Sequence, residues 1–366
     1  MAELRFGDYS AASMAKLLEP LKIGELTLKN RVIMAPLTRC RASGADGRTP
    51  NEMMLEYYVQ RACAGLIITE ATSVTPMGVG YPHTPGIWSA EHVEQWKKIT
   101  TAVHKAGGLM FLQLWHVGRI SDPEYLGGAQ PVAPSAIAAE GHVNLLRPKR
   151  AFSTPRALEE KEIPGIIEAY RQGAANAKAA GFDGVEIHGA NGYLLDQFLQ
   201  DNSNHRTDRY GGSLENRARL MLEVTDAVVS VWGASRVGMH LSPRCDLSSM
   251  GDSNPAATFG YVAEQLGKRK IAFICARESQ QAPRLGPDLK KKFGGLYIAN
   301  EKLTPQTGAE LLAKGEADAI AFGVFFLANP DLPKRIQVEA PLNAPVPQTF
   351  YSEGPVGYTD YPFLEG

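Results

Sequence analysis

The chain has 366 residues, of which 44% are hydrophobic and 21% charged, and its formal net charge is −1. This composition is that of an ordinary globular protein with a large apolar core. A nearly neutral chain lacks the concentrated positive charge with which proteins bind phosphate backbones or anionic membranes, so we expect neither nucleic acid nor a membrane as a partner.

The first segments of the chain are short and polar. Residues 1–15 contain no long apolar stretch, so we expect no signal peptide. Leu21–Asn30 alternates around Gly24 and predicts a β-hairpin, which we expect to plug one end of the fold. No window of the sequence reaches the roughly 18 apolar residues that a membrane span requires.

Eight short apolar runs follow, and each is typical of a strand buried on both faces. They are Arg31–Met34, Leu66–Thr69, Leu109–Leu114, Gly184–His188, Val237–Leu241, Ala272–Cys275, Leu296–Ala299 and Ala319–Phe322. Helical patterns lie between them, such as the one from Pro164 to about Ala180 before Gly181, and the one that Ser213 can cap. Val117–Leu158 is longer than a usual barrel loop and predicts a capping insertion.

The repeated order of strand and helix predicts an α/β protein with one (β/α)8 barrel of the TIM type, formed by residues 1–366. A doubly wound sheet is the alternative topology. The absence of a GxGxxG turn after the first strand weighs against it.

Polar residues follow the predicted strands, where a barrel carries its active site. His188 and Asn191 can share a face and offer two neutral donors to an oxygen that gains negative charge. Tyr193 adds a hydroxyl that can give up a proton. The alternative on these three residues alone is a histidine satisfied by local backbone bonds.

Two further groups of residues indicate a nucleotide-like cofactor, although each is as readily structural. Backbone N–H groups of Asn300, Gly323 and Val324 can face a phosphate, because barrel phosphate sites use the loops after strands seven and eight. The amide of Gln113 can pair with a flavin's pyrimidine edge, and Thr38 can donate to a flavin carbonyl.

The four cysteines do not suggest a metal site or disulfides. Cys40, Cys63, Cys245 and Cys275 are widely spaced and form no CxxC pair. We therefore expect no bound metal and a reducing, cytoplasmic setting.

From about Leu21 to Leu364 the chain resembles the Old Yellow Enzyme family, and among its branches the xenobiotic reductase B type. Ten motifs carry the resemblance in the same order: NRVIMAPLTR (30–39), AGLIITEAT (64–72), PGIW (85–88), QLWHVGR (113–119), QPVAPSA (130–136), AGFDGVEIHGANGYLLDQFL (180–199), RTDRYGGSLENRAR (206–219), ADAIAFG (317–323), LANPDL (327–332) and GYTDYP (357–362).

The resemblance implies non-covalent FMN, reduced by NADPH or NADH, and hydride transfer from flavin N5 in a ping-pong cycle. It implies substrates with activated C=C bonds, nitro groups or nitrate esters. Residues expected to contact the cofactor are Pro36, Leu37, Thr38, Ala71, Gln113, His240, Arg277, Asn300, Gly323 and Val324. His188 and Asn191 would bind the substrate oxygen, Tyr193 would protonate the α-carbon, and Tyr81, Trp115 and Tyr358 would line the pocket.

Two positions depart from the family pattern. His240 stands where an arginine usually meets flavin N1 and O2, and Val324 stands where an arginine usually meets the phosphate. We expect His240 to contact the N1/O2 edge and Arg277 to replace the phosphate arginine. The alternative for Arg277 is an ordinary surface cation.

Two other functions stay open from the residues alone. A flavin-free barrel enzyme, such as an aldolase or isomerase, usually needs a Schiff-base lysine or paired carboxylates at strand ends, and only Lys302 lies near one. A flavin-binding sensor without turnover would not need the set of His188, Asn191 and Tyr193. A monomer and a homodimer are both compatible with the sequence.

Overall fold

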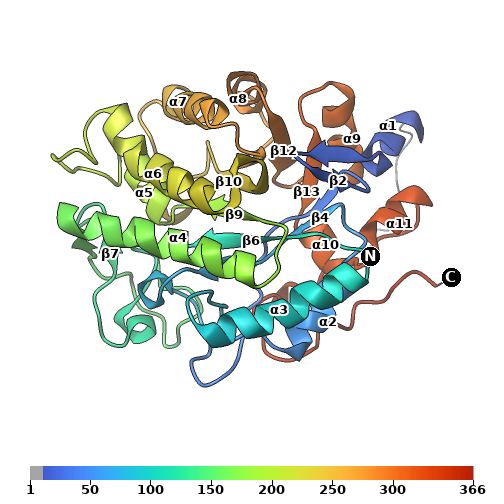
Figure 1. The fold of residues 1–366 in the computed structure, drawn as a ribbon, viewed down its shortest axis with the longest axis horizontal. Helices are drawn as coiled ribbons and strands as arrows, with labels where there is room; N and C mark the ends of the chain where they lie inside the picture. The colour runs from blue at the N-terminus through green and yellow to red at the C-terminus, as the bar shows by residue number, and fades with distance from the viewer. Residues whose placement is uncertain (1–10, 366) are drawn as a thin grey trace.

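Eight parallel strands close into a barrel in the computed structural model, which describes residues 11–365 (Figure 1). The strands are β3 (Val32–Met34), β4 (Leu66–Ile68), β6 (Met110–Trp115), β9 (Gly184–His188), β10 (Val237–Leu241), β11 (Phe273–Arg277), β12 (Leu296–Asn300) and β13 (Ala319–Phe322). They follow one another around the ring in chain order, and pairing of β4 with β6 and of β13 with β3 closes it. The (β/α)8 prediction is therefore confirmed, and the doubly wound alternative is wrong.

Helices surround the ring of strands (Figure 1). They are α1 (Ala11–Ala15), α2 (Glu52–Gln60), α3 (Ala90–Lys105), α4 (Ile163–Ala179), α5 (Leu194–Leu199), α6 (Leu214–Trp232), α7 (Pro255–Lys268), α8 (Gly286–Phe293), α9 (Pro305–Ala313), α10 (Val324–Ala328) and α11 (Leu332–Gln337). Ser213 caps α6 by accepting from the N–H of Asn216, as predicted. Gly181, at φ +82°, follows the end of α4 in the left-handed conformation that glycine tolerates.

Short 3₁₀ helices and strands complete the chain. The 3₁₀ helices span Lys16–Leu18, Pro76–Gly78, Pro123–Leu126, Glu160–Glu162, Ala234–Arg236, Leu247–Ser249 and Pro347–Thr349. The short strand β5 (Thr72–Ser73) pairs with the end of β6. Within the predicted insertion, β7 (Val132–Ala133) pairs with β8 (Arg156–Ala157) in parallel.

Side chains fill the barrel, so its centre is a core and not a channel. The rings of Phe111 and Phe273 lie 5.8 Å apart between their centroids. Two glycines on neighbouring strands make room for them, because a Cβ on Gly184 would lie 2.4 Å from the Phe111 ring and a Cβ on Gly238 would lie 2.2 Å from the Phe273 ring. Each of these large buried rings therefore requires a glycine at the facing position of the neighbouring strand.

The N-terminal hairpin closes the lower end of this core. Its strands are β1 (Leu21–Ile23) and β2 (Leu26–Leu28), which pair antiparallel around Gly24 at φ +56°. Ile23 and Leu28 are fully buried in the same apolar cluster as Phe111 and Phe273. The predicted plug is therefore present, and the opposite end of the barrel is left for a site.

The C-terminal segment is held across the barrel by two buried arginines. Arg39 donates to the carbonyl oxygens of Phe350 and Gly357, and Arg41 donates to those of Thr349 and Phe350, among others. Because both arginines lie in the loop after β3, these bonds fix the tail beside the end of that strand.

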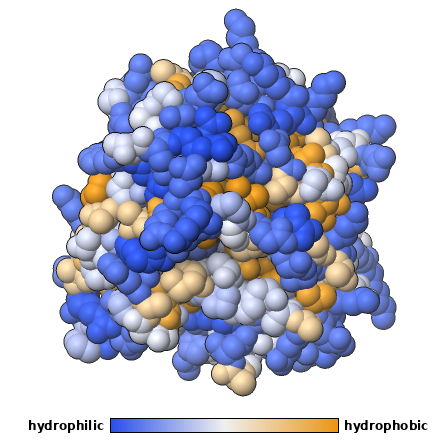
Figure 2. Space-filling model, turned by 60° about the vertical axis from the view of Figure 1, so that its left-hand side comes forward, coloured by the Kyte–Doolittle hydropathy of each residue, from blue (hydrophilic) through white to orange (hydrophobic). Residues whose placement is uncertain are grey.

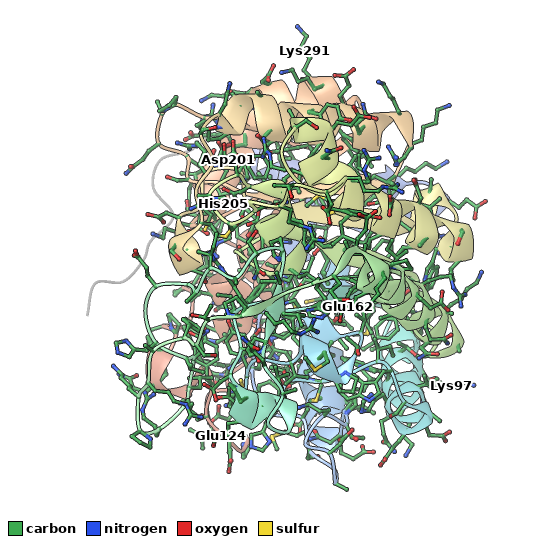
Figure 3. All side chains as sticks on the ribbon, turned by 90° about the vertical axis from the view of Figure 1, so that its left-hand side faces the viewer. Lys97, Glu124, Glu162, Asp201, His205 and Lys291 are labelled. Atoms are coloured by element: carbon green, nitrogen blue, oxygen red, sulfur yellow. The ribbon has the colours of Figure 1, made fainter. Side chains whose placement is uncertain are left out.

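The outer surface is mostly polar. Figure 2 shows hydrophilic residues over most of one face, with apolar residues gathered toward its centre. In Figure 3, Lys97 on α3 and Lys291 on α8 project outward, and the basic run Lys290–Lys292 lies in the last turn of α8. Among the described residues, no helix combines the length and the apolar character needed to cross a membrane. The expectation about a signal peptide falls mainly on residues outside the described range.

We predict that Gly238→Ala lowers the free energy of unfolding by about 1–3 kcal/mol, because the added methyl group has no space beside Phe273. Gly165→Ala is the matched control. Gly165 lies in α4 with nothing near its missing Cβ, so this change should stabilise the protein by about 0.5–1 kcal/mol. Urea unfolding measures the change in stability for both substitutions. Equal effects would contradict the explanation that a methyl group at position 238 is crowded by Phe273.

Candidate active site

A cavity of about 820 Å³ opens at the carboxyl ends of the strands. Its lining includes every predicted site residue but one: Pro36, Leu37, Thr38, Ala71, Tyr81, Gln113, Trp115, His188, Asn191, Tyr193, His240, Arg277, Asn300, Gly323 and Val324. The eight strand ends supply most of these side chains, because barrel closure brings all of them to one rim.

Tyr358 is the exception, and its predicted place in the pocket does not match the structure. It is fully buried outside the cavity and stacks on Tyr57 at 4.2 Å between ring centroids. The guanidinium groups of Arg39 and Arg41 lie over its ring at 5.1 and 4.6 Å from the centroid. Tyr351, from the same C-terminal segment, lines the cavity in its place.

The cavity also has lining residues that the sequence did not single out: Asn144, Leu145, Leu247, Ser248, Glu301, Leu303, Thr304, Phe325 and Tyr351. Asn144 and Leu145 lie in the predicted insertion, and Glu301 follows the seventh barrel strand. The sequence indicates that the insertion and the end of the seventh strand lie near the site. It does not indicate which of their side chains line the cavity.

The turn after β9 holds His188 and Asn191 toward the cavity. The N–H of Gly189 donates to the His240 carbonyl, and the N–H of Asn191 donates to Ser242 Oγ at 2.8 Å, so both ends of the turn are tied to β10 and its loop. Asn191 has φ +58°, a left-handed conformation that asparagine adopts more readily than most residues. The turn is thus fixed before any ligand binds.

His188 is set up as a neutral hydrogen-bond donor. The N–H of Ala190 donates to its Nδ1 at 3.3 Å, which leaves the ring proton on Nε2. Burial lowers the His188 pKa well below its usual range, and the nearby His240 and Arg277 lower it further. Asn191 accepts from Arg277 Nη1 through its Oδ1 at 3.2 Å, so its amide nitrogen remains available as a second donor.

Tyr193 is held by a second tyrosine. Its hydroxyl lies 2.6 Å from that of Tyr81, which also accepts from Asn144 Nδ2 at 3.1 Å. Burial raises the pKa of Tyr193 to about 12, while the hydrogen bond from Tyr81 opposes that rise. The phenol therefore keeps its proton at neutral pH and has a fixed direction.

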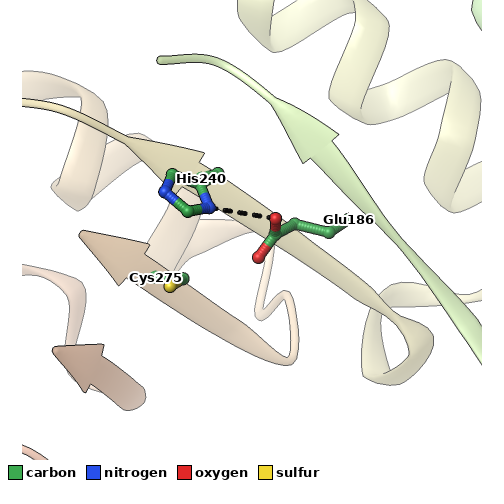
Figure 4. A group of neighbouring side chains, drawn as sticks. All are labelled: Glu186, His240 and Cys275. Carbon is green, nitrogen blue, oxygen red and sulfur yellow. Dashed lines mark hydrogen bonds and ion pairs between the residues drawn. The ribbon is translucent and has the colours of Figure 1, made fainter. Parts of the chain in front are cut away.

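A buried carboxylate lies behind two of the side chains that line the cavity. Glu186 Oε1 accepts from Gln113 Nε2 at 2.8 Å and lies 3.1 Å from His240 Nδ1, while Oε2 has no partner in the structure (Figure 4). Glu186 is fully buried, so these contacts orient the two side chains that meet the cavity.

Glu186, His240 and Cys275 also form the one group of three potential metal ligands among the described residues (Figure 4). Their ligand atoms lie within 4.8 Å of one another. Burial, followed by the nearby Glu186, raises the pKa of the Cys275 thiol well above its usual range. The thiol is therefore protonated at neutral pH, and the contact between Glu186 and His240 is explained without an ion.

Three ionisable side chains from the ends of β11 and β12 also line the cavity. Arg277 donates through Nε to Glu301 Oε2, and Lys302 follows directly. Arg277 thus lines the cavity and is paired with Glu301 and Asn191.

Comparisons with known proteins agree with this arrangement. The family model described as "NADH:flavin oxidoreductase / NADH oxidase family" matches residues 16–343. The chain is 46% identical to 12-oxophytodienoate reductase 1 of Oryza sativa subsp. japonica, over 97% of this chain and 95% of that protein.

Two solved structures are also similar over nearly the whole chain. The Old Yellow Enzyme homologue from Zymomonas mobilis superposes with a TM-score of 0.92 at 46% identity, covering 95% of this chain and all of that one (100%). Morphinone reductase in complex with tetrahydroNAD superposes with a TM-score of 0.92 at 48% identity, covering 95% of this chain and 98% of that one.

We predict that Gln113→Leu lowers the free energy of unfolding by about 1.5–3 kcal/mol, because the buried Glu186 carboxylate loses a donor. In a Glu186→Gln background the same change should have a smaller effect, because the charged acceptor is gone. Urea unfolding of the four proteins measures the difference. An equal loss of stability in both backgrounds would show that the contact with Glu186 is not the cause of the destabilisation.

Proposed function

We propose that this chain, which belongs to the NADH:flavin oxidoreductase / NADH oxidase family and is an Old Yellow Enzyme, reduces activated C=C bonds and nitro compounds. Its cofactor is FMN, and its reductant is NADH or NADPH. The substrates that we propose are α,β-unsaturated carbonyl compounds, nitroalkenes, nitroaromatics and nitrate esters. We further propose that it acts in the cytoplasm as a monomer or homodimer.

The cavity has residues suited to each part of FMN. Gln113 and His240, anchored from below by Glu186, offer polar groups to the pyrimidine edge of the ring, and Thr38 lies at the same rim. Arg277 and Lys302 supply positive charge near the backbone of Asn300 and Val324. When bound, FMN supplies the hydride that the nicotinamide has delivered to it.

The pair of His188 and Asn191 is the observation that carries this proposal. Two neutral donors fixed on one turn can hold a carbonyl or nitro oxygen and stabilise the negative charge that develops on it. A neutral His188 suits this role, because the imidazole donates a hydrogen bond through Nε2–H and keeps that proton. Both donors are oriented by backbone or charged partners, so little reorganisation is needed.

Tyr193 completes the reaction as the proton donor to the α-carbon. Its raised pKa keeps the proton in place until a carbanion-like carbon forms beside it. Tyr81 orients the hydroxyl, and Asn144 from the insertion orients Tyr81. Substrates that need no carbon protonation, such as nitrate esters, do not depend on this step.

We predict that the purified protein is yellow, is bleached by NADPH or NADH, and regains its colour with 2-cyclohexenone. Absorbance in the visible range measures each step. Colourless protein that takes up no added FMN would favour a flavin-free barrel enzyme. Yellow protein that no enone or nitro compound reoxidises would favour a flavin-binding sensor.

We predict that Tyr193→Phe leaves reduction of the flavin by NADPH unchanged and slows 2-cyclohexenone reduction by roughly 10²–10⁴-fold. Reduction of a nitrate ester should change much less. Stopped-flow spectroscopy of the two half-reactions separates these effects. Equal slowing with both substrates would exclude Tyr193 as the proton donor, and Tyr170→Phe, a buried tyrosine on α4 outside the cavity, is the control.

A further inference from the structure

Arg277 reaches from the end of β11 to the turn that carries Asn191. Its Nη1 donates to Asn191 Oδ1 at 3.2 Å, although the two residues are 86 apart in the chain. The bond does not follow from strand pairing, because β10 lies between β9 and β11 and pairs with both. It therefore passes the end of β10 along the rim, and both residues line the cavity.

Glu301 holds Arg277 from its other side. Its carboxylate accepts from Arg277 Nε, and the Glu301 and Arg277 side chains are 18% and 30% exposed. Glu301 has φ +101°, a conformation that strains any residue other than glycine. A strained residue persists where its surroundings fix it, and the ion pair is the contact that does so here. Arg277 is thus fixed between Glu301 and Asn191.

The bond decides which way the Asn191 carboxamide faces. The terminal torsion of a carboxamide is roughly two-fold, so its accepting oxygen and its donating nitrogen can exchange places. A guanidinium has donors only, so Arg277 binds Oδ1 and leaves Nδ2 for the substrate. The opposite orientation would turn Oδ1 toward a substrate oxygen, and the two acceptors would repel. The N–H of Ala190 has the matching role for the imidazole of His188.

The charge of Arg277 also acts on the other two residues of the proposed site. Burial is the main cause that lowers the pKa of His188, and the charges of His240 and Arg277 lower it further. Burial raises the pKa of Tyr193 to about 12, and the charge of Arg277 is among the contributions that oppose this rise. A test must therefore separate the bond to Asn191 from the effect of the charge.

We propose that Arg277 is a positioning residue for the substrate oxygen. Its bond to Asn191 keeps the carboxamide turned so that Nδ2 donates into the cavity, and Glu301 keeps Arg277 in place. The bond carries this inference, which needs no contact between Arg277 and the cofactor. The inference rests on the proposed function, because it takes His188 and Asn191 to bind the oxygen of the substrate.

The test measures how tightly the FMN-saturated protein binds 4-cyanophenol. The ionised form has one oxygen, which stands in for the oxygen that becomes negative during reduction. The change in the visible absorbance of the flavin gives the dissociation constant. We expect Arg277→Met to weaken binding of the anion roughly 10- to 100-fold. Binding of the un-ionised phenol, measured at lower pH, should weaken much less, because a neutral ligand gains less from the donor.

A double-mutant cycle separates the bond from the charge. Asn191→Ala removes the carboxamide that Arg277 orients and leaves the charge in place. In this background, the loss caused by Arg277→Met should be at least about fivefold smaller than in the unaltered chain.

Arg284→Met is the matched control. Arg284 is also a partly buried arginine, at 25% exposed, and it pairs with Glu316 outside the cavity. This substitution should leave binding of the anion unchanged.

Three results would each overturn the inference and leave the proposed reductase function intact. An equal loss in both backgrounds would mean that Arg277 acts through its charge alone. Equal weakening of the ionised and un-ionised phenol would mean a general disturbance of the site. Failure of the Arg277→Met protein to take up FMN would make Arg277 a cofactor ligand instead. By contrast, an unaltered chain that binds no FMN overturns the proposed function, and this inference with it.

Discussion

The hydrogen bonds between β4 and β6 close the ring of eight strands, and the position of every site residue follows from that closure. A closed parallel barrel brings all its carboxyl strand ends to one rim. The two phenylalanines that fill its interior are accommodated by glycines on the adjacent strands, and the hairpin seals the lower end. Only the upper rim is left free, so residues far apart in the chain line a single cavity.

Buried charge then orients the site from below and from the side. Glu186 holds Gln113 and the imidazole of His240, and Glu301 holds Arg277. Glu186 is fully buried and Glu301 half-buried, and because an ionised group away from water is unfavourable unless it is paired, each carboxylate fixes the direction of its partners. The two carboxylates lie at different places in the barrel, because Glu186 contacts side chains of β6 and β10, whereas Glu301 contacts Arg277 at the end of β11.

The proposed chemistry needs its donors to be neutral, and burial provides this. The same desolvation lowers the pKa of His188 and raises that of Tyr193, so the imidazole is uncharged and the phenol keeps its proton. The insertion contributes Asn144, which orients Tyr81 and through it Tyr193. A segment outside the barrel repeat therefore takes part in directing the proton donor.

The sequence by itself determined the eight strands, the hairpin, the helix cap at Ser213 and the cluster of His188, Asn191 and Tyr193, because apolar periodicity, turn residues and short motifs are local. It did not determine which distant side chains meet. Gln113 and Glu186 are 73 residues apart, and Asn191 and Arg277 are 86 apart. Only the tertiary structure placed Tyr358 under two arginines outside the cavity and paired Glu301 with Arg277, since such contacts depend on packing between elements and leave no local pattern.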